Sequence, residues 1–113
     1  MRTALECSRS YGEITKMREK EVEKYFVAKV RNLGGLALKF VSPGFSGVPD
    51  RIVLLPGGFI SFVELKAPGK EPRPLQVRRK KKLEDLGFRV YIVDSKEKAD
   101  MVLKMMEVAS HGI

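Results

Sequence analysis

Apolar residues recur along the first third of the chain at the spacing of an amphipathic α-helix. A helix is predicted from about Ile14 to Leu33, because four apolar residues fall four, four and three positions apart along one face. This stripe consists of Val22, Phe26, Val30 and Leu33. The glycine pair Gly34–Gly35 follows directly and predicts the end of the helix, since glycine readily takes the left-handed conformation found there.

Short apolar runs separated by turns predict four strands in the rest of the chain. The predicted strands cover residues 36–41, 51–55, 59–65 and 89–93. Residues 42–49 contain two prolines and two glycines and are predicted as a loop, and residues 56–58 as a turn.

Two further helices complete the pattern. One is predicted over residues 75–86, between a proline and a glycine that suit its two ends. The last helix is capped by Asp94 or Ser95 and runs to about Val108, with Glu97 placed to complete a capping box behind Asp94. The order helix, strand, strand, strand, helix, strand, helix predicts an α/β fold.

Size and composition narrow the classes of function. The 113 residues fit one domain, and no apolar run approaches the ~18 residues of a membrane helix. The chain has one cysteine, Cys7, and one histidine, His111, so a disulfide, a zinc site or Ser–His–Asp catalysis is poorly supported. Any metal must be held by oxygen atoms, which favours magnesium or manganese.

Positive charge is concentrated in one segment. The net charge is +8, and residues 66–82 hold eight basic residues against one acid, a local charge of +7. Such a segment favours an anionic partner, most commonly nucleic acid, although a solvated basic face is the alternative. In the predicted helix Arg78 and Lys82 share a face, and Val77 and Leu83 should turn inward or sideways. The candidate DNA contacts are Lys70, Arg73, Arg78, Arg79, Lys81 and Lys82.

The turn at residues 56–58 determines which residues face each other across the second and third strands. If the turn has three residues, the register places Asp50 opposite Glu64. Opposed residues have Cβ atoms about 4.5–5.5 Å apart, so these carboxylates repel each other unless a cation lies between them. Lys66 points the same way as Glu64, because side chains alternate along a strand. The alternative is a solvated Asp–Glu–Lys cluster.

At these residues the sequence resembles a nuclease motif. Pro49-Asp50, followed by Glu64-Leu65-Lys66, is similar to the PD-(D/E)xK motif. Five stretches, in order and at family-like spacing, resemble the virus-type replication-repair nuclease domain, VRR-NUC, in its stand-alone phage-like form. They are residues 19–23 (EKEVE), 34–40 (GGLALKF), 47–51 (GVPDR), 62–66 (FVELK) and 74–76 (PLQ).

The resemblance implies a fold and a domain organisation. The expected fold is a restriction-endonuclease-like core of order αβββαβα, with a mixed central sheet flanked by helices. Residues 16–113 are expected to form one VRR-NUC-like nuclease domain and residues 1–15 an N-terminal arm. Because no signal peptide is visible at the N-terminus, a cytoplasmic location is expected, in the host cell if the protein is phage-encoded.

The resemblance also implies the composition of a metal site. Asp50 and Glu64 are expected to hold Mg²⁺ or Mn²⁺, with the backbone carbonyl of Leu65 as a further ligand. Lys66 corresponds to the catalytic lysine of the family.

Two further catalytic positions are implied on the helices. An acid on the first helix usually completes the site; Glu19 matches this position best, and Glu23, one turn later, is the runner-up. Gln76 matches a glutamine at the start of the second helix. It is expected either to contact a phosphate or a site water, or to cap the helix locally.

The predicted function is metal-dependent endonucleolytic cleavage of DNA, with branched DNA such as a Holliday junction favoured by the resemblance. The alternative is a non-catalytic nucleic-acid-binding protein on the same fold. Resolving a four-way junction needs two opposed nicks, so a homodimer is expected. Phe45, at the tip of the predicted loop, is expected to contact DNA or a second subunit. Further candidate interface residues on the last helix are Met101, Val102, Met105, Met106 and Val108.

Overall fold

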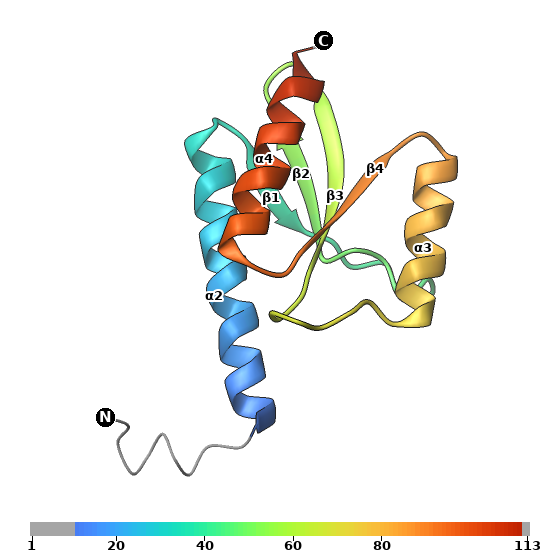
Figure 1. Ribbon diagram of the computed structural model, residues 1–113. Helices are drawn as coiled ribbons and strands as arrows, with labels where there is room; N and C mark the ends of the chain where they lie inside the picture. Colours follow the sequence, from blue (N-terminus) through green and yellow to red (C-terminus); the bar gives the residue numbers. More distant parts are fainter. Residues whose placement is uncertain (1–10, 112–113) are drawn as a thin grey trace.

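Within residues 11–111, which the computed structural model describes (side chains from residue 18), four strands form one mixed sheet (Figure 1). The elements are α2 (Tyr11–Asn32), β1 (Leu36–Lys39), β2 (Arg51–Leu55), β3 (Phe59–Leu65), α3 (Pro74–Asp85), β4 (Arg89–Val93) and α4 (Lys96–Ser110). The strands lie in the order β1-β2-β3-β4, with the first two pairs antiparallel and β3–β4 parallel. The predicted αβββαβα order and mixed sheet are confirmed.

Two element boundaries near the N-terminus differ from the predictions. Helix α2 begins at Tyr11, so residues 11–15 of the predicted arm are helical. The rest of that arm, residues 1–10, lies outside the described residues. Strand β1 ends at Lys39 rather than Val41, because the chain turns away into the loop that precedes β2.

Helix α4 is capped by Ser95. Its side-chain oxygen accepts a hydrogen bond from the Lys98 backbone N–H at 3.0 Å, and its backbone is extended, as an N-cap residue requires. The predicted capping box of Asp94 with Glu97 is wrong, because the helix begins one residue later than that box requires.

Helix α2 ends as its glycine pair predicts. The Gly34 N–H donates to the carbonyl of Arg31 and the Gly35 N–H to that of Val30, with Gly34 at φ +80°. A Cβ atom on Gly35 would lie 2.4 Å from the carbonyl oxygen of Leu54. The second glycine therefore allows the helix end to lie directly against β2.

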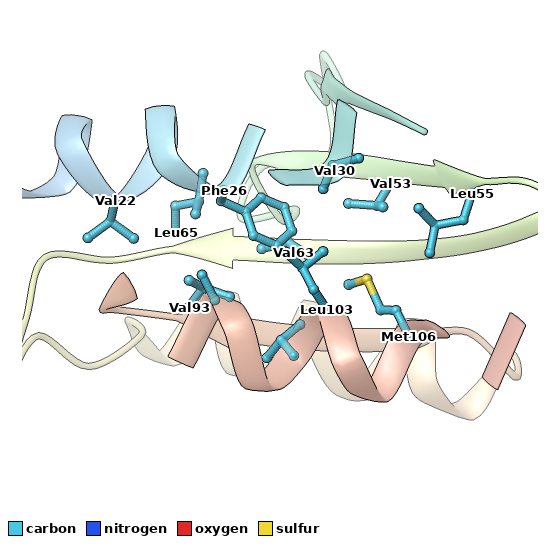
Figure 2. Close-up of a cluster of buried hydrophobic side chains, with 12 residues drawn as sticks. Val22, Phe26, Val30, Val53, Leu55, Val63, Leu65, Val93, Leu103 and Met106 are labelled. Atoms are coloured by element: carbon cyan, nitrogen blue, oxygen red, sulfur yellow. The ribbon is translucent and has the colours of Figure 1, made fainter. Parts of the chain in front are cut away.

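The main hydrophobic core lies between the sheet and the helix pair α2 and α4 (Figure 2). The predicted stripe is confirmed: its first three residues are buried, and Leu33 packs partly buried against the core. The helices and strands contribute Val22, Phe26, Val30, Val53, Leu55, Val63, Leu65, Val93, Ala99, Val102, Leu103 and Met106.

Helix α3 contacts β4 on the opposite face of the sheet (Figure 1). A small aromatic group fills part of this face: the ring of Phe62 lies 5.6 Å from that of Phe40 and 5.7 Å from that of Phe88. Because strand side chains alternate, Glu64 points toward the α3 side while its two neighbours enter the main core. No helix within residues 11–111 is long and apolar enough to cross a membrane.

Candidate active site

The register of the β2–β3 hairpin brings two carboxylates together. Leu55 faces Phe59, and the pairing continues to Arg51 opposite Val63, so the three-residue turn is confirmed and Asp50 and Glu64 come next in register. The carboxylate of Asp50 accepts a hydrogen bond from the Leu65 N–H at 2.9 Å. This bond holds the carboxylate of Asp50 against the end of β3. The Asp50 carbonyl accepts a second bond, from the Phe40 N–H at 2.8 Å.

Glu64 is a buried carboxyl group with a pKa far above its ordinary value. Only 4% of the residue is exposed, and its Oε1 atom has no hydrogen-bond partner among the described residues. Burial, followed by the hydrogen bond to Asp50 and the negative charge of Asp50, raises the pKa of Glu64 to about 9. The positive charges of Lys66 and Arg73 act in the opposite direction on this pKa.

The carboxylates of Asp50 and Glu64 have the properties of a binding site for a divalent cation. An unpartnered buried carboxylate oxygen is costly in an apolar setting, and a second carboxylate beside it adds repulsion once both are ionised. A hard cation would relieve both penalties through oxygen ligands. A cavity of about 10 Å³ beside Glu64 has roughly the room of one water molecule, and Pro49 and Gln76 line it.

The two acids considered on the first helix have different positions. Glu23 accepts a hydrogen bond from Arg51 at 3.1 Å, and Arg51 also donates to the carbonyl of Ala37 at 2.9 Å. This pair joins α2 to β2 and β1 on the face of the sheet opposite Glu64. Glu19 lies half-buried one turn earlier on α2.

Among the described residues, no three acidic, histidine or cysteine side chains are grouped so that they could hold a metal ion. The structure thus brings together Asp50 and Glu64 without a third carboxylate. The roles of Glu19 in catalysis and of the Leu65 carbonyl as a metal ligand stay predictions.

Lys66 and Gln76 both lie close to the carboxylate pair. Lys66 is half-buried, its N–H donates to the Val93 carbonyl at 2.9 Å, and its charge lowers the pKa of Glu64. Gln76 is buried, and its Oε1 accepts a hydrogen bond from the Arg73 N–H at 2.9 Å. The capping interpretation of Gln76 is therefore confirmed, and the same side chain also lines the cavity beside Glu64.

The basic residues of α3 fall into two groups. Arg78 and Lys82 are exposed, as are Lys70 and Arg73 on the loop before the helix. Within the helix, Lys80 pairs with Glu84 at 3.1 Å and Lys81 with Asp85 at 3.7 Å.

Arg79 behaves differently from its neighbours. Its Nε donates to the Ser46 carbonyl at 2.8 Å, and its guanidinium carbon lies 3.8 Å from the ring centre of Phe45. The sequence pattern does not distinguish Arg79 from the adjacent basic residues; the exposed aromatic tip of the 42–49 loop is the one local signal of a partner. Val77 is 51% exposed, so the inward or sideways position predicted for it is wrong. The inward position next to it is taken by Gln76 instead.

The raised pKa of Glu64 predicts how the metal-free protein responds to pH. In the unfolded chain this carboxyl ionises near pH 4.5, whereas in the folded chain it keeps its proton up to about pH 9. The folded state thus binds more protons in this window, and its stability should fall with rising pH by up to about 1.4 kcal/mol per unit. Thermal unfolding in EDTA from pH 5 to 9 should show this fall.

Glu64→Gln is the control for this pH dependence and should flatten it. Magnesium added at pH 8–9 should raise the melting temperature of the wild type, since a ligand that binds the folded state stabilises it. A wild-type melting temperature that is independent of pH would contradict the buried, protonated state of Glu64.

Two comparisons with known proteins agree with the geometry, whereas no protein-family model matches the chain. A phage protein, "Putative nuclease p44" of Acyrthosiphon pisum secondary endosymbiont phage 1, is 53% identical over 81 residues, which span 72% of this chain and 87% of that protein. A solved structure of a VRR_NUC domain superposes with a TM-score of 0.73 at 36% identity, covering 77% of this chain and 95% of that one.

Proposed function

This chain belongs to the VRR-NUC family of nuclease domains, and on that premise we propose that it is an Mg²⁺- or Mn²⁺-dependent endonuclease that cleaves DNA. The observation that carries the metal dependence is the buried pair of Asp50 and Glu64 with an unpartnered carboxylate oxygen. Two close carboxylates repel an anionic partner, so a protein that only binds DNA would be weakened by them. Their presence therefore favours catalysis over binding alone.

The chemistry divides among the residues of the site. When bound, a divalent cation would neutralise charge on the scissile phosphate and make water a better nucleophile. Asp50 and Glu64 supply oxygen ligands, and the Leu65 N–H fixes the orientation of the first carboxylate. Lys66, on the same face as Glu64, stabilises negative charge that develops on the phosphate or orients the attacking water. The side chain of Gln76 limits the space beside Glu64.

The direct test is a cleavage assay on three DNA substrates of matched sequence. Four-way junction, single-stranded and duplex DNA are incubated with the purified protein in Mg²⁺, in Mn²⁺ and in EDTA. Cleavage that requires the metal and is fastest on the junction supports the whole proposal. Equal rates on all three substrates would remove the preference for branched DNA, and absence of metal-dependent cleavage would remove the enzymatic function.

The exposed basic residues on and before α3 are proposed to bind the DNA backbone. They are Lys70, Arg73, Arg78, Lys81 and Lys82. Replacing Arg78 and Lys82 by serine should weaken binding to all sequences alike. The slope of log K against log salt on duplex should fall by roughly 0.9 for each phosphate that the variant no longer neutralises. An unchanged slope would identify this face as merely solvated.

A homodimer is proposed because one chain offers one carboxylate pair, whereas a four-way junction needs two opposed cuts. Val102 and Met106 are buried in the core, but Met101, Met105 and Val108 stay 56%, 48% and 53% exposed along one face of α4. An apolar, methionine-rich stripe of this kind suits an adaptable interface.

Light scattering on the wild type and on Met101→Glu/Met105→Glu should show a dimer and a monomer, respectively. A wild-type protein that is monomeric at micromolar concentration, alone and on junction DNA, would contradict the dimer. A double variant that remains dimeric would move the interface elsewhere. Another candidate is the exposed sheet surface of Leu36, Leu38 and Ile60.

A further inference from the structure

The loop of residues 42–49, which joins β1 to β2, forms one wall of the site. It crosses from the sheet toward α3 and returns (Figure 1). Pro49, at its end, is buried and lines the cavity beside Glu64. The next residue is Asp50. The position of this loop therefore decides where the first carboxylate of the pair lies.

Arg79 holds the tip of this loop through two different interactions. Its Nε donates a hydrogen bond to the Ser46 carbonyl at 2.8 Å, and its guanidinium lies over the ring of Phe45, with the central carbon 3.8 Å from the ring centre. Arginine makes both contacts at once, because its Nε–H donates while the flat guanidinium lies against the ring. Lysine keeps the charge but has a single ammonium group, which cannot occupy both positions.

The next residue of the loop lies directly against α3. Gly47 has φ +85°, and a Cβ atom on it would come within 2.7 Å of Cγ of Leu75 and 3.3 Å of Cγ of Arg79. Three consecutive residues, 45–47, are thus fixed to α3 by stacking, by a hydrogen bond and by close packing. Only two residues separate this anchored tip from Asp50.

The other end of the loop is closed by the backbone. The Phe40 N–H donates to the carbonyl of Asp50, and the Leu65 N–H donates to its carboxylate. Asp50 is therefore held in two ways. Backbone N–H groups at the ends of β1 and β3 donate two hydrogen bonds to it, and the loop before it is anchored on α3. Release of the loop tip at Arg79 removes one of these restraints and leaves the two hydrogen bonds from Phe40 and Leu65.

We propose that Arg79 is a positioning residue: it fixes the 42–49 loop on α3 and thereby holds Asp50 beside Glu64, rather than binding the DNA backbone. This inference rests on the proposed nuclease function for its kinetic consequences. It assigns one of the six candidate DNA-binding residues to the construction of the site. It also gives the exposed aromatic Phe45 a role within its own chain.

The test compares Arg79→Lys with Phe45→Leu in the 113-residue protein, with Arg31→Lys, an exposed arginine on α2, as the matched control. Arg79→Gln, which removes the charge, is added for the salt dependence of DNA binding. Both test variants should lower kcat roughly tenfold or more and raise the Mg²⁺ concentration for half-maximal rate, as removal of the support behind a metal ligand does. The salt slope of DNA binding in EDTA should be unchanged in both, and also in Arg79→Gln, because Arg79 neutralises no phosphate in this proposal. The double variant should be no worse than either single change, because both break the same interaction.

A second readout does not depend on activity. Hydrogen exchange of the Leu65 amide, measured by NMR in EDTA, reports the bond to Asp50 and should be faster in both test variants and unchanged in Arg31→Lys. A salt slope that falls by about 0.9 in Arg79→Gln, which removes the charge, with kcat retained would overturn the proposal in favour of phosphate binding. Unchanged kcat and unchanged exchange would overturn it as well. A wild type without metal-dependent cleavage would defeat the nuclease function, while the exchange data would still decide the positioning role.

Discussion

Asp50→Asn and Glu64→Gln should each reduce metal-dependent DNA cleavage by about 10³-fold or more and at the same time make the metal-free protein more stable. In the proposed function, each substitution removes an anionic oxygen that would hold the metal ion, and the loss of activity follows from this. The gain in stability follows from the burial of Glu64 and from its coupling to Asp50, which together raise the pKa of Glu64 to about 9. Glutamine at position 64 removes the titrating group and with it the whole cost, whereas asparagine at position 50 removes only the negative charge that adds to the effect of burial, so the larger gain is expected for Glu64→Gln.

Each substitution also preserves the local structure. Asparagine at position 50 keeps an oxygen that accepts from the Leu65 N–H, and glutamine at position 64 keeps a donor toward Asp50. The combination of an inactive and a more stable protein cannot arise from misfolding. Cleavage rates and melting temperatures in EDTA at pH 8 measure the two effects, and Glu71→Gln, which removes an exposed carboxylate from the loop after β3, is the control. Cleavage at the wild-type rate in either site variant would disprove the site assignment.

The local elements and the hairpin register are visible in the sequence because short-range physics determines them. A turn of three residues between two alternating strands leaves one register, and this register places Asp50 next to Glu64. The α2 stripe follows from helical spacing alone, and its end follows from Gly34. Predictions of this kind need no knowledge of the rest of the chain.

Contacts between elements that are far apart in the sequence do not follow from local sequence patterns. Glu23 is a second candidate for the metal site in the sequence. In the structure its carboxylate accepts a hydrogen bond from Arg51, 28 positions later, on the face of the sheet opposite Glu64. Arg79 is one of five consecutive basic residues, and only its interaction with Phe45, far back in the sequence, separates it from the others. Helix periodicity also leaves open which side chain of α3 turns inward, and Gln76 does so because the Arg73 N–H needs an acceptor.

Lys66→Met should lower cleavage by about 10²- to 10³-fold and leave metal binding intact. Lys66 lies on the same face of β3 as Glu64, is half-buried, and is close enough for its charge to lower the pKa of that carboxyl. Methionine keeps an unbranched, flexible side chain that fills similar space, so the packing around the site should survive. Only the positive charge near the reacting phosphate is removed.

Lys66→Met should separate the two properties of the site, because cleavage is lost while metal binding is kept. Calorimetric titration with Mn²⁺ should give Lys66→Met an affinity equal to or tighter than that of the wild type, because both carboxylates remain and a competing positive charge is gone. Asp50→Asn, by contrast, should lose both Mn²⁺ binding and cleavage. Lys104→Met, an exposed lysine on α4, controls for the loss of one charge. If Lys66→Met loses Mn²⁺ affinity as completely as Asp50→Asn, then Lys66 supports the carboxylate pair rather than the reaction, and its catalytic role must be withdrawn.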